Sequence, residues 1–500
     1  MAPAQDTLGA MRTRVVVALA LVAIVAYAIA LRWRILGATP FPTGIDGYFY
    51  PVQLRALLAH GSLAYPASPL AFWFMAPFAA ITEPITGAKL GAAVGGALIA
   101  LPAFALGARL GRGWGAGLLA AALAAFSAGS TYLTVEYVKN GIGLTVALAA
   151  LWLLLRAIET PSRTRLAGAA AGLVAAILAH KMAAAIVLAI GVPAALAAAI
   201  GRGQLRGRRL LYTLGAGVAA LLGLVLLGLL APRRLLSPED LRLVHGLFAS
   251  TADWELPALH TRNVTLAMGH EALTGAVLAV GAGVALWLRG SRLAPAERAV
   301  AWAVVGLALA IALPVIAVDD PQGLGFRLRL VAFVPRALCG AIICIALTDR
   351  DWIVAAAAVV LAVLAPRDER VDGEIVTHPA LITAALALQG QIPTGDVAIV
   401  PERHIAFMVA WYADVEVSLR PERVPPAHRW RVMPLSFIGM GSPLDQALMA
   451  ARAEPGLAAP IGVHPRHPNG MVLVAEPTWA WLLERLPPPA KKRFTAWPTI

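Results

Sequence analysis

Charged residues are scarce in this sequence. Of its 500 residues, 14% are Asp, Glu, Lys or Arg and 59% are hydrophobic, whereas about a quarter of the residues of a soluble domain are charged. This composition excludes an ordinary soluble protein and predicts a polytopic membrane protein. The net charge of +13 would suit nucleic acid, but the basic residues cluster in short loops between apolar runs, where they set membrane topology. We therefore expect membrane lipid around the chain and no nucleic-acid partner.

Cysteine is nearly absent, and the common catalytic motifs are missing. The two cysteines, Cys339 and Cys344, lie inside one apolar segment, and their spacing does not place them on one helical face. Neither a disulfide framework nor a cysteine metal site is expected. The sequence also contains no Walker A, G-x-S-x-G, H-E-x-x-H or dinucleotide-binding fingerprint. This absence argues against an ATP-driven pump and against the common soluble hydrolases.

Long apolar runs fill the first three quarters of the chain. A transmembrane helix needs about 20 apolar residues to cross roughly 30 Å of hydrocarbon. By this measure we predict about 11 transmembrane helices, at 15–36, 85–108, 114–133, 141–155, 166–179, 182–200, 210–231, 272–288, 299–318, 330–348 and 352–365. The run 166–200 would otherwise form a helix of about 52 Å. We expect it to break at His180 and Lys181, its only polar point.

The loop charges predict the orientation. With the break at His180, the arginine-rich loops fall on the side of the N-terminus, which is the pattern of a cytoplasmic N-terminus. The A-I-A at 28–30 resembles a signal-peptidase site, but the apolar run continues to Leu36, so we expect an uncleaved first span. The chain is then a multi-pass protein of the plasma (inner) membrane.

The composition changes after Pro366, where Pro, His, Arg and Glu become frequent. We predict a transmembrane domain at 1–366 with a first outer loop at 37–84, and a small soluble α/β domain at 367–500 on the periplasmic or extracellular face. In the tail, 396–400, 415–419 and 471–475 resemble strands, the last after a turn at 468–470. The segment 442–453 resembles a helix capped by Ser442.

Asp46 is the leading candidate for chemistry. It is the only acid between Asp6 and Glu83, and it lies in a polar break just beyond the first span. There it would act as a base or hold a divalent cation; the alternative is a solvated loop acid or a helix cap. Glu136 is the second acid near an outer span end, and the pair would suit Mg²⁺ or Mn²⁺. A local pair between Glu136 and Lys139 is an equal alternative.

Basic residues near the outer face are the candidates for binding phosphate. An arginine inside a span is expensive and should face a cavity or the bundle interior, and guanidinium groups bind phosphate in a bidentate manner. The substrate-binding candidates are His180, Lys181, Arg327, Arg329 and Arg336. The alternatives are snorkelling at the interface for the arginines, and a polar turn without further function for His180 and Lys181.

The first outer loop also contains an amphipathic segment. Residues 51–62 place leucines on one side of a helix, and the aromatic residues Tyr65, Phe72, Trp73 and Phe74 follow. Such a combination is typical of a segment that lies on the membrane surface. We expect it to cover a cavity next to Asp46.

Four segments resemble the GT-C superfamily of membrane glycosyltransferases. They are G-I-D-G-Y-F-Y at 44–50, E-Y-V-K-N at 136–140, A-H-K at 179–181 and F-R-L-R-L-V-A-F-V-P-R at 326–336. The superfamily includes oligosaccharyltransferase catalytic subunits, protein O-mannosyltransferases and aminoarabinose transferases. The chain lacks the W-W-D-x-G block of the first group and the paired Asp-Glu of the second, so no particular acceptor is implied.

The resemblance implies transfer of a sugar from a polyprenyl-phosphate or polyprenyl-diphosphate carrier to a glycan, lipid or protein acceptor on the outer face. Asp46 would be the base or metal ligand, Glu136 would support it, and the basic residues would stabilise the leaving phosphate. The alternative is a polytopic transporter or lipid flippase, although the acids gather on one face and no repeated half with broken helices is apparent. A third possibility is a non-catalytic assembly subunit.

Overall fold

The computed structural model describes the greater part of the chain. The described residues are 3–44, 46–203, 207, 263–312, 330–347, 350–364, 379–400, 402–418, 421–439, 441–463 and 470–495. They divide into two compact units. The membrane unit comprises Met1–Ile35, Ser68–Phe74 and Gly91–Val371, and the tail unit comprises Leu36–Ala67, Met75–Leu90 and Asp372–Ile500. The predicted domain boundary at residue 366 stays a prediction.

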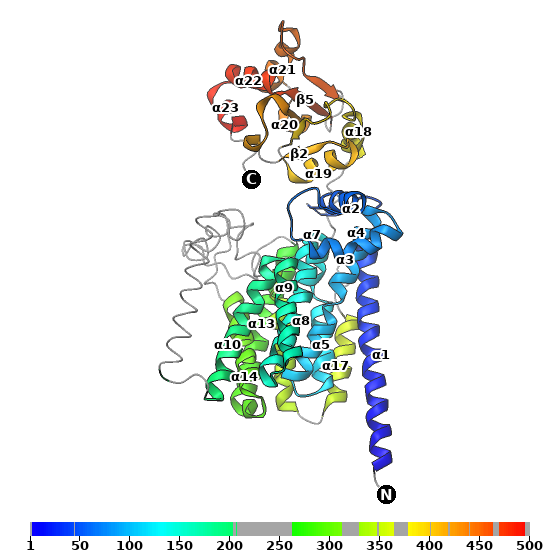
Figure 1. The fold of residues 1–500 in the computed structure, drawn as a ribbon, viewed down its shortest axis with the longest axis vertical. Helices are drawn as coiled ribbons and strands as arrows, with labels where there is room; N and C mark the ends of the chain where they lie inside the picture. The colour runs from blue at the N-terminus through cyan, green and yellow to red at the C-terminus, as the bar shows by residue number, and fades with distance from the viewer. Residues whose placement is uncertain are drawn as a thin grey trace. The chain divides into compact units, whose positions relative to one another are not determined.

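The membrane unit is a bundle of apolar helices (Figure 1). Its helices are α1 (Pro3–Leu36), α5 (Ala100–Leu110), α6 (Trp114–Ala125), α7 (Ala128–Glu136), α8 (Val138–Glu159), α9 (Arg163–Ala179), α10 (Lys181–Gly201), α13 (Asn263–Arg289), α14 (Pro295–Ala312), α16 (Phe333–Ile343) and α17 (Asp351–Leu364), with short 3-10 turns η2 (Gly290–Arg292) and η3 (Cys344–Leu347). Helices α3 (Leu70–Ile81) and α4 (Pro84–Ala97) contribute residues to both units.

Among the described residues, six helical segments are long and apolar enough to cross a membrane. They are Met11–Leu36, Pro84–Leu110, Val138–Glu159, Lys181–Gly201, His270–Arg292 and Pro295–Ala312. The pair α6 and α7 adds a seventh if it is one span bent by 46°. The spans predicted at 166–179, 330–348 and 352–365 coincide with the shorter helices α9, α16 and α17, and the span predicted at 210–231 lies outside the described residues. The prediction of a polytopic α-helical membrane protein is confirmed.

The break predicted in the run 166–200 is also confirmed. Helix α9 ends at Ala179 and α10 begins at Lys181, with His180 between them in an extended conformation. The His180 Nδ1 accepts a hydrogen bond of 3.2 Å from the backbone N–H of Met182. This bond satisfies one of the donors that every helix N-terminus leaves without an intrahelical partner.

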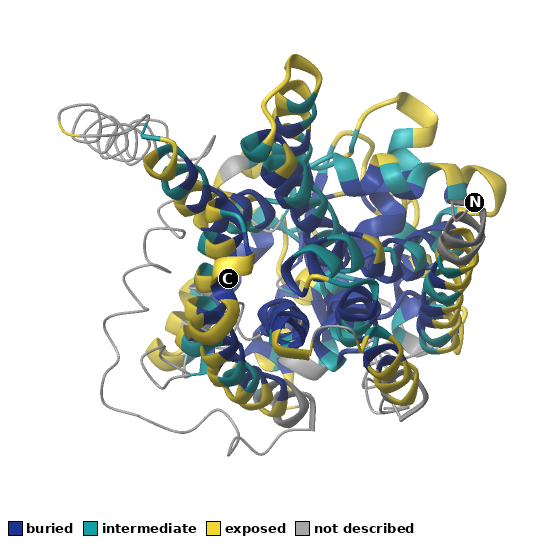
Figure 2. Ribbon diagram, turned by 90° about the horizontal axis from the view of Figure 1, so that it is seen from below, coloured by how far each residue is buried: buried dark blue, intermediate teal, exposed yellow. Residues whose placement is uncertain are grey.

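The helices of the membrane unit are buried on the faces that pack together and exposed on their outward faces (Figure 2). In α13, Ala279 and Ala282 are buried, whereas Val277, Val280 and Val284 are more than half exposed. Lipid tails are as apolar as these valines, so helices associate in a bilayer through close packing of small residues. The exposed stripe of α13 is therefore the surface expected to face lipid.

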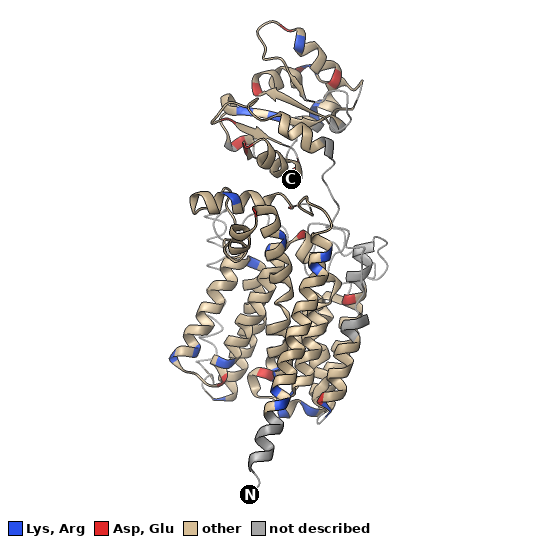
Figure 3. Ribbon diagram, turned by 90° about the vertical axis from the view of Figure 1, so that its right-hand side faces the viewer, with Lys and Arg blue, Asp and Glu red and all other residues tan. Residues whose placement is uncertain are grey.

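Charged residues of the membrane unit lie mostly near the ends of its helices (Figure 3). Glu297, in the first turn of α14, pairs with Arg109 at 2.9 Å and with Arg112 at 3.0 Å. Arg109 also pairs with Glu159 at the end of α8. These ion pairs join α5, α8, α14 and the turn after α5 at one end of the bundle, where charge is less expensive than at the bilayer centre.

The tail unit contains a five-stranded mixed sheet in the order β2-β1-β3-β5-β4. The strands are β1 (Val397–Ile399), β2 (Glu416–Ser418), β3 (Arg429–Pro434), β4 (Ile461–Val463) and β5 (Met471–Ala475). Strand β1 is parallel to β2 and β3, and β5 is antiparallel to β3 and β4. The helices of the unit are α2 (Phe49–His60), α18 (Pro379–Ala387), α19 (Arg403–Tyr412), α20 (Leu435–Ile438), α21 (Pro443–Ala453), α22 (Glu476–Arg485) and α23 (Pro488–Thr495), and its 3-10 turns are η4 (Pro421–Arg423) and η5 (Pro426–His428).

The sequence pattern predicted part of the secondary structure of the tail. Strands β1, β2 and β5 and helix α21 lie where the sequence predicts them, and Ser442 Oγ accepts the backbone N–H of Asp445 at 3.1 Å as the expected cap. The turn predicted at 468–470 lies almost wholly outside the described residues. Strand β3 and helix α22 were not predicted. They pack through the fully buried Trp479, and the Arg431 guanidinium binds the Glu476 carboxylate at 2.8 and 2.9 Å.

Replacing Asp396 by asparagine is expected to make the tail unit less sensitive to acid. Hydrogen bonds from the Trp430 indole at 2.8 Å and with His428 at 2.7 Å lower the pKa of Asp396 below its ordinary value of 3.8. A lowered pKa means stability that is present above pH 3.8 and is lost as the pH falls through the folded-state pKa. The difference in melting temperature between native protein and Asp396→Asn should therefore shrink below about pH 4. A difference that stays constant from neutral to acidic pH would contradict this assignment.

Candidate active site

Asp46 lies in a tight turn that leads into α2. Gly44 has a left-handed φ of 81°, and its carbonyl accepts the backbone N–H of Gly47 at 3.0 Å. The carbonyl of Asp46 accepts the N–H of Phe49, the first residue of α2, at 2.9 Å. Glycine adopts a left-handed φ without steric penalty. The local sequence thus fixes the backbone that carries the carboxylate.

Arg403 holds the Asp46 carboxylate in place. The Arg403 Nε lies 2.7 Å from Asp46 Oδ1, and only 14% of the Asp46 side chain is exposed. The same guanidinium lies over the rings of Phe49 and Phe407, at 5.5 and 5.8 Å from their centroids. A guanidinium on aromatic faces is favourable in its own right. Asp46 is therefore a largely buried, ion-paired acid and not a solvated one, and its catalytic role stays a prediction.

Replacing Gly47 by alanine is expected to disturb this turn. A Cβ at position 47 would lie 2.7 Å from the carbonyl oxygen of Thr43 and 3.0 Å from that of Gly44. Both contacts involve backbone atoms, so the turn itself must shift, at a typical cost of about 1–3 kcal/mol for overpacking. Thermal unfolding of Gly47→Ala should show this loss. Gly306→Ala is the matched control, because a Cβ at Gly306 meets nothing within 4 Å; equal melting temperatures of the two variants would contradict the crowding at Gly47.

The helix that follows Asp46 is anchored to the tail within the same unit. Phe49 packs on Phe407 with ring centroids 4.8 Å apart, and the hydroxyls of Tyr48 and Tyr412 lie 3.1 Å apart. A helix is confirmed over most of the range 51–62, as α2, but its amphipathic pattern is not. The buried residues are the consecutive run from Phe49 to Leu54, which includes Gln53, whereas Leu58 is exposed. The position of α2 at the membrane surface stays a prediction.

Glu136 is the last residue of the short helix α7 in the membrane unit. Its side chain is buried, with 8% of the residue exposed, and Tyr137 separates it from the start of α8. Helix α7 begins after the 46° bend from α6, a break that the sequence did not predict. Ser127 starts α7 by accepting the N–H of Ser130 at 2.9 Å.

Two buried charges secure the break between α6 and α7. Glu271 accepts the backbone N–H groups of Ala128 and Gly129 at 2.9 and 3.0 Å. Arg32 donates to the carbonyl of Ala125 at 2.8 Å and to Ser130 Oγ at 2.7 Å. An acid thus meets the N-terminus of α7 and a cation meets the C-terminus of α6, which is the arrangement that helix dipoles favour. Neither role was predicted from the sequence.

Arg336 is the partner of Glu271. Its Nη2 lies 3.2 Å from Glu271 Oε1 and donates to the carbonyl of Leu123 at 3.3 Å. The expectation that Arg336 faces the bundle interior is therefore met, and a carboxylate of α13 already neutralises its charge. Binding of substrate phosphate by Arg336 stays a prediction. Arg327 and Arg329 lie outside the described residues.

The other predicted residues are distributed over the two units. His180 caps α10, as described above, and Lys181 is the first residue of that helix; their binding of substrate stays a prediction. Asp46 belongs to the tail unit, whereas Glu136, His180, Lys181 and Arg336 belong to the membrane unit. The approach of Asp46 to Glu136 therefore stays a prediction.

A divalent cation was predicted between the two acids. Within the described ranges, no three His, Cys, Asp or Glu side chains form a group that would hold a metal ion. Asp46 offers a carboxylate whose Oδ1 is already paired with Arg403, so a cation would have to share or replace that pairing. A metal at Asp46 stays a prediction.

Most of the chain resembles a solved structure in its fold. The oligosaccharyltransferase of Archaeoglobus fulgidus, crystallised with Zn and sulfate, matches with a TM-score of 0.53 at 14% sequence identity, over 87% of this chain and 70% of that one. The chain therefore shares its fold with this oligosaccharyltransferase, which belongs to one of the enzyme groups that the sequence resembles. At this identity the likeness concerns the fold alone.

A second solved structure also matches, with a lower TM-score. ArnT from Cupriavidus metallidurans in the apo state has a TM-score of 0.36 at 13% identity, over 90% of this chain and 97% of that one. No protein-family model matches the chain, and no curated protein sequence does.

Proposed function

We propose that this GT-C protein is a membrane glycosyltransferase that moves a sugar from a polyprenyl-phosphate or polyprenyl-diphosphate carrier to an acceptor on the outer face of the plasma membrane. The observation that carries the proposal is Asp46. Its carboxylate is nearly buried, is fixed by the turn before α2 and is oriented by Arg403. A catalytic base must be held within hydrogen-bond reach of its target, and a carboxylate whose position is fixed in this way supports that role.

In the proposed reaction, Asp46 accepts the proton of an acceptor hydroxyl while the hydroxyl oxygen bonds to the anomeric carbon of the sugar. The bond between that carbon and the carrier phosphate breaks, and its electron pair stays on the phosphate oxygen. Positive side chains stabilise the charge that develops there. His180, Lys181, Arg327, Arg329 and Arg336 are the proposed set for this task.

Glu136 is proposed to support Asp46. Its burial at the end of α7 suits a carboxylate that orients another group. Asp46 and Glu136 are the side chains that would hold Mg²⁺ or Mn²⁺, and such a cation would supply further positive charge next to the leaving phosphate. The acceptor is proposed to be a glycan, a lipid or a protein, with the N-terminus in the cytoplasm and the tail outside.

Reconstituted vesicles test this function against transport. The purified chain is placed in liposomes with fluorescent polyprenyl-phosphate sugars in one leaflet, and a mixture of glycan, lipid and peptide acceptors is added on that side. A transferase consumes the donor, releases the polyprenyl phosphate and forms a glycosylated product. Movement of intact donor to the other leaflet without product would instead identify a transporter or flippase and would contradict the proposal.

A further inference from the structure

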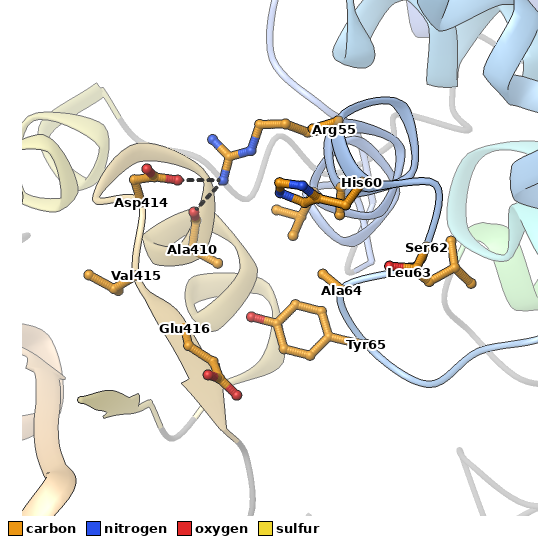
Figure 4. A pocket seen from close by; sticks show the side chains of 13 residues that line it. Arg55, His60, Ser62, Leu63, Ala64, Tyr65, Ala410, Asp414, Val415 and Glu416 are labelled. Atoms are coloured by element: carbon orange, nitrogen blue, oxygen red, sulfur yellow. Dashed lines mark hydrogen bonds and ion pairs between the residues drawn. The ribbon is translucent and has the colours of Figure 1, made fainter. Parts of the chain in front are cut away.

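A hollow of about 490 Å³ lies in the tail unit, between the C-terminal half of α2 with its following loop and the end of α19 with the start of β2 (Figure 4). Binding sites for small molecules commonly have volumes of about 300–1,000 Å³. The hollow is separate from the turn that carries Asp46, and neither Asp46 nor Arg403 lines it. It is thus available for a part of the substrate that the proposed mechanism does not use.

Arg55 of α2 builds one wall of the hollow. Its guanidinium donates to the carbonyls of Ala410 and Trp411 at 3.0 and 3.2 Å, near the end of α19. It also pairs with Asp414 at 3.1 Å and stacks on the Trp411 ring at 4.8 Å. The last carbonyls of a helix have no intrahelical partner, so Arg55 satisfies two of them and fixes the wall.

Tyr65 builds the opposite wall. The fully buried side chain of Gln53 donates to the Tyr65 carbonyl at 2.7 Å and accepts the Tyr65 N–H at 2.9 Å, which closes the loop after α2. The Tyr65 hydroxyl accepts the backbone N–H of Val417 at 3.2 Å. Burial, with a contribution from the Glu416 carboxylate, raises the pKa of Tyr65. The hydroxyl therefore keeps its proton and can donate it into the hollow.

The hollow is lined by both hydrogen-bond donors and carboxylates. Tyr65 and Glu416 lie near one another, while Arg55 and Asp414 lie at another edge (Figure 4). Glu416 is exposed, and no described residue forms an ion pair with it. Arg55 is paired with Asp414, so the other titratable carboxylate and imidazole of the lining are Glu416 and His60, and Glu416 is the one lining carboxylate without an arginine partner among the described residues. An anionic group such as a phosphate is therefore disfavoured.

We propose that this hollow binds a neutral, hydroxyl-rich saccharide unit of the acceptor. A sugar hydroxyl both donates and accepts hydrogen bonds, so it can donate to Glu416 and accept from Tyr65. A protonated amine only donates hydrogen bonds, so it could donate to Glu416 but could not accept from Tyr65. The apolar surface from Val52, Ala56 and Leu63 suits the C–H face of a sugar ring. The inference rests on the proposed function. In that function the donor carries a phosphate, which the carboxylate of Glu416 would repel, so we assign the hollow to the acceptor.

Saturation-transfer NMR on the full-length protein in detergent tests the inference directly. The probes are methyl mannoside, methyl galactoside and methyl arabinofuranoside, with inorganic phosphate and cyclohexylamine as the competing chemistries. Ala59 lines the hollow and Leu58, its exposed neighbour on α2, does not. Ala59→Trp fills the hollow and should abolish glycoside binding, whereas Leu58→Trp should bind as the native protein does. Glu416→Gln removes the charge without filling space and should weaken binding about tenfold.

The outcomes separate this inference from the proposed function. If at least one glycoside binds the native protein and Asp46→Asn, but not Ala59→Trp, the inference is supported whatever the transfer assay shows. If no glycoside binds at tens of millimolar, or if Ala59→Trp binds as well as Leu58→Trp, the inference is wrong even when sugar transfer is detected. Displacement of the bound glycoside by phosphate or cyclohexylamine would also overturn it, since the site would then recognise charge.

Discussion

Replacing Asp46 by asparagine is expected to lower the rate of sugar transfer by about 10²- to 10⁴-fold, the usual contribution of a general base. The carboxamide has nearly the same shape, and its oxygen can still accept the hydrogen bond from Arg403 Nε that the carboxylate accepts at 2.7 Å. It cannot accept the proton of the acceptor hydroxyl. Initial rates of product formation by equal amounts of reconstituted native and variant protein measure the effect.

The matched control for this prediction is Glu454→Gln. Glu454 is an exposed carboxylate of the same unit, at the end of α21, and its loss should leave the rate unchanged. The melting temperatures of both variants should stay close to the native value, which separates loss of chemistry from loss of fold. A variant Asp46→Asn that is folded and transfers sugar at the native rate would remove Asp46 from the mechanism.

Replacing Glu271 by alanine is expected to lower the free energy of unfolding by about 3–5 kcal/mol. Only 6% of the Glu271 side chain and 16% of the Arg336 side chain are exposed, so the variant leaves a largely buried guanidinium without its carboxylate. The N–H groups of Ala128 and Gly129 also lose their acceptor. Denaturant titration of the protein in detergent, followed by tryptophan fluorescence, measures the loss.

A double-mutant cycle identifies the cause. Arg336→Met removes the cation, and the double variant Glu271→Ala with Arg336→Met should be more stable than the sum of the two single losses predicts, by about 0.5–3 kcal/mol. His270→Ala, at the exposed neighbour of Glu271 on α13, should change the stability by less than about 0.5 kcal/mol. Strictly additive losses would show that the pair contributes no coupling.

The apolar helices of this protein could be predicted because each depends on the length and apolar character of its own segment. Within the described ranges, every predicted span coincides with an apolar helix, since a bilayer dictates both the length and the apolar character of a span. The break at His180 followed from the same rule, because an unbroken helix would have been far longer than the bilayer is thick. The same reasoning missed the bend between α6 and α7, where the polar cap is a single serine within an apolar run.

The partners of the candidate site residues could not be predicted because they come from distant parts of the chain. Arg403 meets Asp46 only after the tail has folded against α2, and nothing in the sequence around Arg403 marks it. Glu271 was not among the predicted site residues, although it pairs with Arg336 and caps α7. The sequence identified which polar residues were unusual for their surroundings. Which of them pair is decided by the packing of helices and sheet.

The most direct test of the central claim is the stoichiometry of the reaction in proteoliposomes. Released polyprenyl phosphate and glycosylated acceptor are measured together, by thin-layer chromatography of the lipids and mass spectrometry of the acceptors, for the native protein and for Asp46→Asn. The native protein should release one carrier for each sugar transferred, and Asp46→Asn should release almost none. Native vesicles in which every donor molecule stays intact, in whichever leaflet it is found, would contradict the assignment of this chain as a glycosyltransferase.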